Sequence, residues 1–106
     1  MSGRIQGLLA RLRAELEQVY AARLRGVYLY GSYARGEEDA ESDVDVIIVL
    51  DRVDGYLGEV RRTSVLISAL SLESGLSISR VLVPERDWIE RDSPFLANAR
   101  LEAIAA

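Results

Sequence analysis

Residues 30 to 45 read YGSYARGEEDAESDVD and stand between two apolar segments. Val27–Tyr30 (VYLY) is β-branched and aromatic, which predicts a short strand running into the glycine and serine that follow it. Asp43–Leu50 (DVDVIIVL) is apolar on both faces beyond its two aspartates, which is the pattern of a central strand. The stretch therefore predicts two carboxylates at the mouth of a buried strand, shortly after a glycine-serine turn.

The remainder of the chain predicts helices around these strands. Apolar side chains recur at three- and four-residue steps along residues 2–25, so we expect an amphipathic helix that stops at Gly26. Ser32–Gly36 fits one helical turn. The later elements are expected, in chain order, at Leu57–Glu73 (helix, with Leu57, Val60, Ser64, Ile67 and Leu70 on its inward face), Leu76–Val83 (strand), Glu85–Arg91 (helical turn) and from Phe95 to about Ile104 (helix). This order predicts an α+β domain around a small sheet.

The composition excludes several kinds of site. The chain has no cysteine and no histidine, so it has no disulfide, no thiolate or imidazole metal ligand, and no Ser-His or Cys-His nucleophile. Any metal must bind to oxygen ligands, which favours Mg²⁺ or Mn²⁺. The net charge of −4 argues against a broad electrostatic contact with nucleic acid.

Length and hydropathy set the broad class of the protein. A chain of 106 residues fits one small domain, residues 1–106, with one core. Its 49% hydrophobic and 28% charged residues are typical of a globular protein. No apolar run is long enough to cross a bilayer, and residues 1–7 lack the hydrophobic segment of a signal peptide. We therefore expect a cytoplasmic protein without a membrane partner.

Asp43 and Asp45 share one face of the expected strand, with their Cα atoms about 6.5 to 7 Å apart. Together they could hold one cation or form one edge of a two-metal site. The alternative is an ordinary solvated strand end, because Asp-x-Asp is a common pattern. Gly31-Ser32 favours the first interpretation, since glycine lets the backbone approach a ligand closely and the hydroxyl adds a donor for phosphate oxygens. The combination predicts phosphoryl or nucleotidyl transfer.

These residues carry a family resemblance. GSYARGEEDAESDVD resembles the signature of the DNA polymerase β-type nucleotidyltransferase superfamily, which is Gly-Ser, ten residues, then Asp-x-Asp. Ala34-Arg35-Gly36 and Ser42-Asp43 resemble its small prokaryotic branch, the minimal nucleotidyltransferases. The resemblance covers about residues 20–83, followed by a helical segment at about 84–106. It implies a small mixed β-sheet of the polymerase β palm-like type, packed with helices.

The resemblance also implies a chemistry. Asp43 and Asp45 would bind the divalent ions, Mg²⁺ or Mn²⁺, that carry a nucleoside triphosphate such as ATP. Gly31 and Ser32 would cradle its β- and γ-phosphates. Attack at the α-phosphate would transfer a nucleoside monophosphate and release pyrophosphate. This chemistry asks the protein mainly for positioning and charge neutralisation, so the absence of histidine and cysteine is no handicap.

Two arginines near this motif have open interpretations. Arg35 could contact the phosphates or the acceptor. Equally, it could tie the polar loop together by pairing with one of its acids, Glu37, Glu38 or Asp39. Arg80, on the third strand, would bring positive charge near the site if the register of that strand were shifted.

The match to the family departs at one position. Active members usually carry a third carboxylate on the next strand, which here is LSISRVLV and contains no acid. Ser77 or Ser79 is expected to occupy that position, and serine supplies no charge for a metal and is a poor base. Glu73, Glu85 and Asp87 flank the strand and could reach in, or they could be ordinary surface acids.

The departure leaves competing hypotheses about function. Minimal nucleotidyltransferases are often encoded beside a small helical HEPN protein as toxin–antitoxin pairs, and some attach AMP to that partner. The resemblance therefore implies an antitoxin that modifies a HEPN-type protein, in a homo- or hetero-oligomer. The alternative is a catalytically degenerate binding module that neutralises or regulates its partner by contact. Transfer to a small molecule such as an aminoglycoside has less support, because no acceptor domain is visible.

Overall fold

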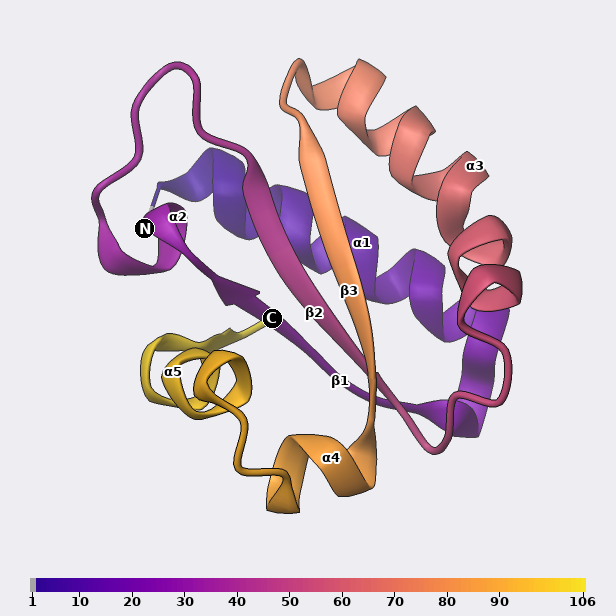
Figure 1. The fold of residues 1–106 in the computed structure, drawn as a ribbon. Helices are drawn as coiled ribbons and strands as arrows, with labels where there is room; N and C mark the ends of the chain where they lie inside the picture. Colours follow the sequence, from indigo (N-terminus) through magenta and orange to yellow (C-terminus); the bar gives the residue numbers. More distant parts are fainter. Residues whose placement is uncertain (1) are drawn as a thin grey trace.

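The centre of the molecule is a small mixed sheet (Figure 1). The computed structural model describes residues 2–106. The strands are β1 (Leu24–Tyr30), β2 (Val44–Leu50), β3 (Ile78–Pro84) and β4 (Ile104–Ala105). They lie in the order β3-β2-β1-β4, with β1 antiparallel to both β2 and β4, and β2 parallel to β3. This arrangement confirms the expected α+β class with a mixed sheet.

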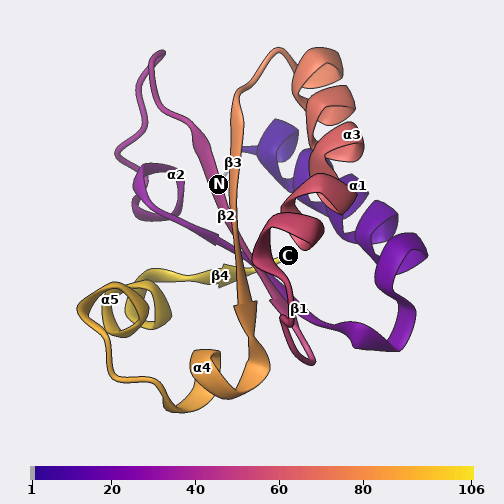
Figure 2. The ribbon, with the colours of Figure 1, turned by 45° about the vertical axis from the view of Figure 1, so that its right-hand side comes forward.

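Helices cover both faces of the sheet. They are α1 (Gly3–Tyr20), the 3₁₀ turn η1 (Ala21–Arg23), α2 (Ser32–Arg35), α3 (Tyr56–Ser74), α4 (Glu85–Glu90) and α5 (Pro94–Glu102). Figure 2 shows α1 and α3 on one side of the sheet and α4 and α5 on the other. Of the helices described between residues 2 and 106, none has the length and apolar character needed to cross a bilayer.

Strand β2 has an apolar side chain on both faces because both faces are covered. Its even-numbered positions from Val44 to Leu50 belong to the core shared with α1 and α3. Ile47 and Val49 belong to a second cluster with side chains of α4 and α5. All these side chains are at most 1% exposed, and burial of each contributes about 1.5–3 kcal/mol. The near-continuous apolar run that follows Asp45 is thus explained by two-sided burial.

The first helix ends earlier than the sequence pattern predicts. Ala21 adopts a φ of 49° and ends α1, so the chain turns through η1 and enters β1 at Leu24. Gly26 was expected to stop the helix, and that prediction is wrong, because Gly26 is buried inside β1. A Cβ there would lie 2.6 Å from a ring carbon of Tyr28, so a larger residue would displace that ring.

The inward face of α3 also differs from the prediction. Leu57 was expected to point inward, but it is 69% exposed. Glu59 and Thr63 are buried instead, and they lie about two turns and one turn before Ile67 on the same face of the helix. The sequence pattern assigned the face from apolar residues alone, whereas Glu59 is buried because two arginines pair with it.

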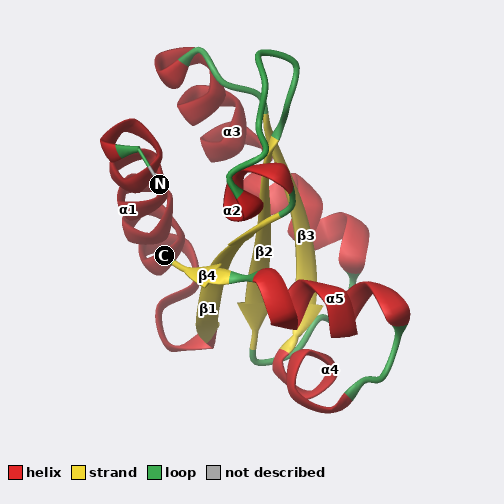
Figure 3. Cartoon of the chain, turned by 90° about the vertical axis from the view of Figure 1, so that its left-hand side faces the viewer, coloured by secondary structure: helices red, strands yellow, loops and turns green. Residues whose placement is uncertain are grey.

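The C-terminal segment ends in a strand rather than a longer helix. Ser93 caps α5, since its Oγ accepts a hydrogen bond from Leu96 N. The helix was expected to reach about Ile104, but it ends at Glu102. Ile104 and Ala105 instead pair with β1 as β4 (Figure 3). A two-residue strand has no periodicity that a sequence pattern could reveal.

Candidate nucleotide and metal site

The topology brings the end of β1 to the beginning of β2. Because these strands are antiparallel, Tyr30 is the register partner of Asp45, and Gly31 follows directly. Because β3 runs parallel to β2, its beginning lies at the same end, where Ser79 is the partner of Asp45 on the other side. Residues distant in sequence thus meet at one end of the sheet, with α2 beside them (Figure 3).

Gly31 allows the backbone at the end of β1 to lie close to the Asp45 carboxylate. Its φ is +76°, a conformation that L side chains rarely adopt. A Cβ on Gly31 would lie 2.5 Å from Oδ2 of Asp45, so a larger residue would force that carboxylate to move. Its carbonyl accepts hydrogen bonds from Ala34 N and Arg35 N, which close the single turn of α2 beginning at Ser32. The predicted neighbours Gly31 and Asp45 therefore do lie together.

Two carboxylates of like charge share this end of the sheet. Asp43 is exposed just before β2, whereas Asp45 is partly buried on the strand. Burial raises the pKa of Asp45, and the charge of Asp43 raises it further, while Arg35 acts in the opposite direction. We call Asp43, Asp45 and Gly31 the acidic mouth. Its carboxylates repel each other, and a bound cation would relieve that repulsion.

The Arg35 guanidinium donates hydrogen bonds to acidic side chains of the same chain. Its Nη1 donates to both carboxylate oxygens of Glu102, at 3.3 and 3.1 Å, and its Nε donates to Glu37 at 3.4 Å. The Glu37 contact is the loop pairing considered as one interpretation. Glu102 was not anticipated as a partner, and its Oε1 also accepts a hydrogen bond from Gly31 N at 3.0 Å.

The position expected for a third carboxylate is occupied by serine. Ser79 is in register with Asp45, whereas Ser77 precedes β3 and is exposed. The three flanking acids that could have reached in are paired elsewhere, in the ion pairs Glu73–Arg11, Glu85–Arg25 and Asp87–Arg91. Glu85 and Asp87 follow the far end of β3.

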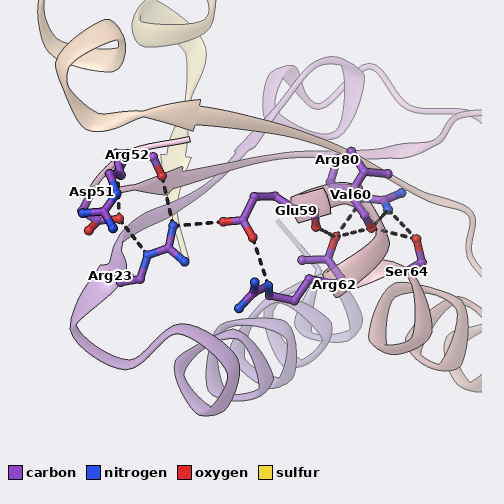
Figure 4. Close-up of polar contacts among 9 residues, drawn as sticks. Arg23, Asp51, Arg52, Glu59, Val60, Arg62, Ser64 and Arg80 are labelled. Atoms are coloured by element: carbon purple, nitrogen blue, oxygen red, sulfur yellow. Dashed lines mark hydrogen bonds and ion pairs between the residues drawn. The ribbon is translucent and has the colours of Figure 1, made fainter. Parts of the chain in front are cut away.

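Arg80 contributes its charge to the opposite face of the sheet. Its guanidinium donates to Thr63 Oγ1 at 3.2 Å, to the Val60 carbonyl at 2.6 Å and to Ser64 Oγ at 2.9 Å. Figure 4 shows these contacts with α3. The register is therefore the unshifted one, and Arg80 is bound to the helix rather than to the acidic mouth.

A comparison with protein families identifies the chain. A family model described as a nucleotidyltransferase domain matches residues 9–100. The chain belongs to the nucleotidyltransferase family. The chain is 32% identical over 75 residues to a protein of Methanocaldococcus jannaschii that carries the provisional name protein adenylyltransferase MJ0141. The match covers 71% of this chain and 75% of that relative.

Solved structures share the nucleotidyltransferase fold. One is the crystal structure of a mutant MntA-HpeT toxin-antitoxin, with a TM-score of 0.59 and 19% identity. Another is that of a toxin-antitoxin with AMP-PNP, with a TM-score of 0.60 and 21% identity. In both, the match covers 90% of this chain and 69% of the other. At these identities the likeness concerns the fold.

The carboxylate oxygen atoms of the acidic mouth are of the type that hard divalent cations prefer. Asp43 and Asp45 could supply carboxylate ligands, and Ser79 a neutral hydroxyl. Within residues 2–106 there is no group of three acidic side chains that could enclose a metal ion. A site of this composition fits an ion that takes its remaining ligands from water and from the phosphates of a substrate, as Mg²⁺ does.

A second group of charges lies at the opposite end of β2, and sequence reasoning missed it. We call it the paired cluster; it consists of Arg23, Asp51, Glu59 and Arg62 (Figure 4). Arg23 donates to Asp51 at 3.0 Å and to Glu59 at 3.0 Å, and Arg62 pairs with the second oxygen of Glu59 at 3.0 Å. Desolvation acts to raise the pKa of Asp51. Hydrogen bonds from Arg23 and from the Arg52 backbone, together with the charges of both arginines, outweigh it and lower the pKa.

Proposed function

We propose that this chain is a divalent-metal-dependent nucleotidyltransferase that transfers AMP from ATP to a protein, as the antitoxin of a toxin–antitoxin pair. The observation that carries the proposal is the approach of Asp45 to Gly31, which unites the carboxylates with the glycine-serine turn. The provisional name of the M. jannaschii relative supports a protein acceptor and AMP. The toxin-antitoxin structure with AMP-PNP supports a nucleotide and a toxin partner.

Each residue of the site has a role in the proposed chemistry. Asp43 and Asp45 hold the cation, Mg²⁺ or Mn²⁺, which when bound neutralises the triphosphate and favours attack at its α-phosphate. Gly31 N–H and the Ser32 hydroxyl hold the β- and γ-phosphates. Arg35 adds a charge-assisted contact to the same phosphates. Together these groups orient the leaving pyrophosphate in line with the attacking oxygen.

The proposed transfer is a single displacement. A hydroxyl oxygen of the acceptor forms a bond to the α-phosphorus, and the bond from that phosphorus to the oxygen bridging to the β-phosphate breaks. The electron pair of the broken bond leaves with pyrophosphate. The hydroxyl proton passes to water, because the neighbouring Ser79 is a poor base. We expect slow turnover for the same reason.

The acceptor in this proposal is a HEPN-type helical toxin, as the resemblance to the minimal nucleotidyltransferases implies. Modification of the toxin by AMP adds a phosphate charge to it, and such a charge can block a binding surface or an active site. The working assembly is then a hetero-oligomer of toxin and antitoxin.

A second candidate function is neutralisation by contact alone. Its support is Ser79, which stands in register with Asp45 where the family usually has an acid. In this case the site binds nucleotide without turning it over, and the toxin is restrained by the antitoxin surface.

A labelling experiment with ATP labelled at its α-phosphate distinguishes the two candidate functions. The purified protein is incubated with this ATP, Mg²⁺ and extract of its own organism, beside a variant with both Asp43→Ala and Asp45→Ala. A labelled protein that the variant fails to produce supports AMP transfer and reveals the acceptor. A blank result, with an acceptor that an active relative does label, overturns transfer and favours neutralisation by contact.

A further inference from the structure

Glu102 occupies the donors that the proposed function assigns to phosphate. Its Oε1 accepts from Gly31 N at 3.0 Å, and both of its oxygens lie within 3.3 Å of Arg35 Nη1. A carboxylate with a backbone N–H and a guanidinium around it is bound as a phosphate oxygen would be. The Glu102 side chain is only 25% exposed, so most of it is packed against the protein at this position.

Glu102 contacts the donors of the proposed phosphate site and is not part of the Asp43–Asp45 pair. Its oxygens accept hydrogen bonds from Gly31 N and Arg35 Nη1. Within residues 2–106 no three acidic side chains form a group that could hold a metal ion, so Glu102 does not join Asp43 and Asp45 as the missing third acid.

The backbone around Glu102 fixes its position. Glu102 is the last residue of α5, and one residue later the chain pairs with β1 as β4. The pairing is short, Leu29 with Ile104 and Tyr28 with Ala105, and is extended by a hydrogen bond from Ala106 N to the Val27 carbonyl at 2.9 Å. The helix on one side and the strand on the other present the carboxylate to Gly31 with little loss of entropy.

We propose that Glu102 is an internal competitor of the triphosphate, which sets how tightly this site binds nucleotide. The proposal rests on the proposed function, because it assigns Gly31 and Arg35 to phosphate. With Glu102 in place the donors are occupied and a second anion is repelled. Nucleotide binds only when the carboxylate has moved away, so the apparent affinity is lower than that of the open site.

The test measures binding rather than transfer. Dissociation constants are determined by calorimetry for Mg²⁺ with AMP-PNP, and for inorganic tripolyphosphate alone, with the wild type, Glu102→Gln and Glu102→Ala. We expect both variants to bind both ligands more tightly, on the order of tenfold. The matched control is Glu15→Gln, an exposed residue of α1 on the other side of the sheet, which removes the same charge and should leave both constants unchanged.

A double-mutant cycle with Arg35→Ala locates the effect. If Glu102 competes for Arg35, the gain from Glu102→Gln shrinks when Arg35 is absent. Equal affinities of the wild type and both Glu102 variants overturn the proposal and leave the proposed function intact. Weaker binding by the variants also overturns it, since Glu102 would then be orienting Arg35 for the nucleotide. If folded wild type and folded variants all fail to bind either ligand, the proposed function itself fails, and the competitor proposal falls with it.

Discussion

The two ends of strand β2 carry charges arranged in opposite ways. At the end near Asp51, the paired cluster places two acids against two arginines, with ion-pair distances of 3.0 Å. At the other end, the acidic mouth places Asp43 and Asp45 together, and Arg35 gives its hydrogen bonds to other acids. One end is neutralised by the chain itself, whereas the other carries excess negative charge.

This difference separates charges that stabilise the fold, such as that of Asp51, from charges that have no neutralising partner within the described part of the site, such as that of Asp45. The pKa of Asp51 is lowered by its cationic and backbone partners despite desolvation, so its ionised form stabilises the folded state. The pKa of Asp45 is raised by burial and by Asp43, so its ionised form destabilises the folded state. A strand end that brings two carboxylates together in this way is suited to a cation.

The largest expected effect is the loss of transfer at the acidic mouth. Asp45→Asn should lower AMP transfer about 100-fold or more, because it removes a charged metal ligand while keeping the side-chain shape. The free energy of unfolding should be unchanged or higher. Labelling with ATP and urea unfolding measure the two quantities on the same preparation. A loss of transfer that merely accompanies unfolding would contradict the distinction between the two ends.

Glu59→Gln should show the reverse pattern at the paired cluster. It leaves Arg23 and Arg62 without their shared partner, and we expect the free energy of unfolding to fall by about 2 kcal/mol, less than for a fully buried pair because both arginines are partly in solvent. Nucleotide affinity should not change. Glu90→Gln is the matched control, since its exposed pair with Arg86 should contribute at most about 0.5 kcal/mol. Equal losses in the two variants would refute the assignment.

Gly31→Ala should affect both stability and the site. The φ of +76° and the contact with Asp45 Oδ2 predict a loss of about 1–2 kcal/mol in the free energy of unfolding, together with weaker nucleotide binding. Gly58→Ala is the control of opposite sign, because a Cβ there meets open space within a helix and should stabilise the protein by about 0.5–1 kcal/mol. Chemical unfolding and calorimetric titration give the two readouts.

The pH dependence should distinguish Asp45 from the other acids. A carboxyl group whose folded pKa is raised favours its protonated form in the fold. Its stabilising effect is therefore present below its unfolded pKa, near 3.8, and is lost as the pH rises through the higher folded value. Asp45→Asn should accordingly be more stable than the wild type at pH 7, and the gap should close as the pH falls to that region. A gap that is constant with pH would show that Asp45 is not destabilising when ionised.

The smallest expected effect is that of restoring an acid on β3. Ser79→Asp adds a third negative charge in register with Asp45, so without metal the free energy of unfolding should fall by about 0.5 kcal/mol. With Mg²⁺ present the loss should be recovered, and AMP labelling should rise. Thermal unfolding with and without Mg²⁺ measures the first effect. Unchanged labelling would count against Ser79 as the missing ligand position.

Local patterns were sufficient where structure is set by neighbours in sequence. The alternation of aspartates with valine predicted that the carboxylates open a buried strand, and the glycine-serine turn was placed beside them. The choice between Ser77 and Ser79 could not be made from sequence, because it depends on the register between β2 and β3. Register follows from packing across the whole sheet.

Residues whose contacts are distant in sequence could not be identified from local sequence patterns. Glu102 is 71 positions from Gly31, and its role follows only from where α5 ends on the sheet. Glu59 looks like a surface acid on a helix, and its burial follows from the phase of α3 and from Arg23, 36 positions away. Sequence patterns report local periodicity, whereas these contacts arise from tertiary folding.

The two-sided burial of β2 has a consequence for motion. Amide groups in a strand covered by helices on both faces exchange with solvent mainly through global unfolding, whereas frayed ends open at little energetic expense. Asp45 lies on this strand, whereas the backbone that follows Glu102 pairs with β1 over only two residues. We therefore expect hydrogen exchange to be slower in the centre of β2 than in β4.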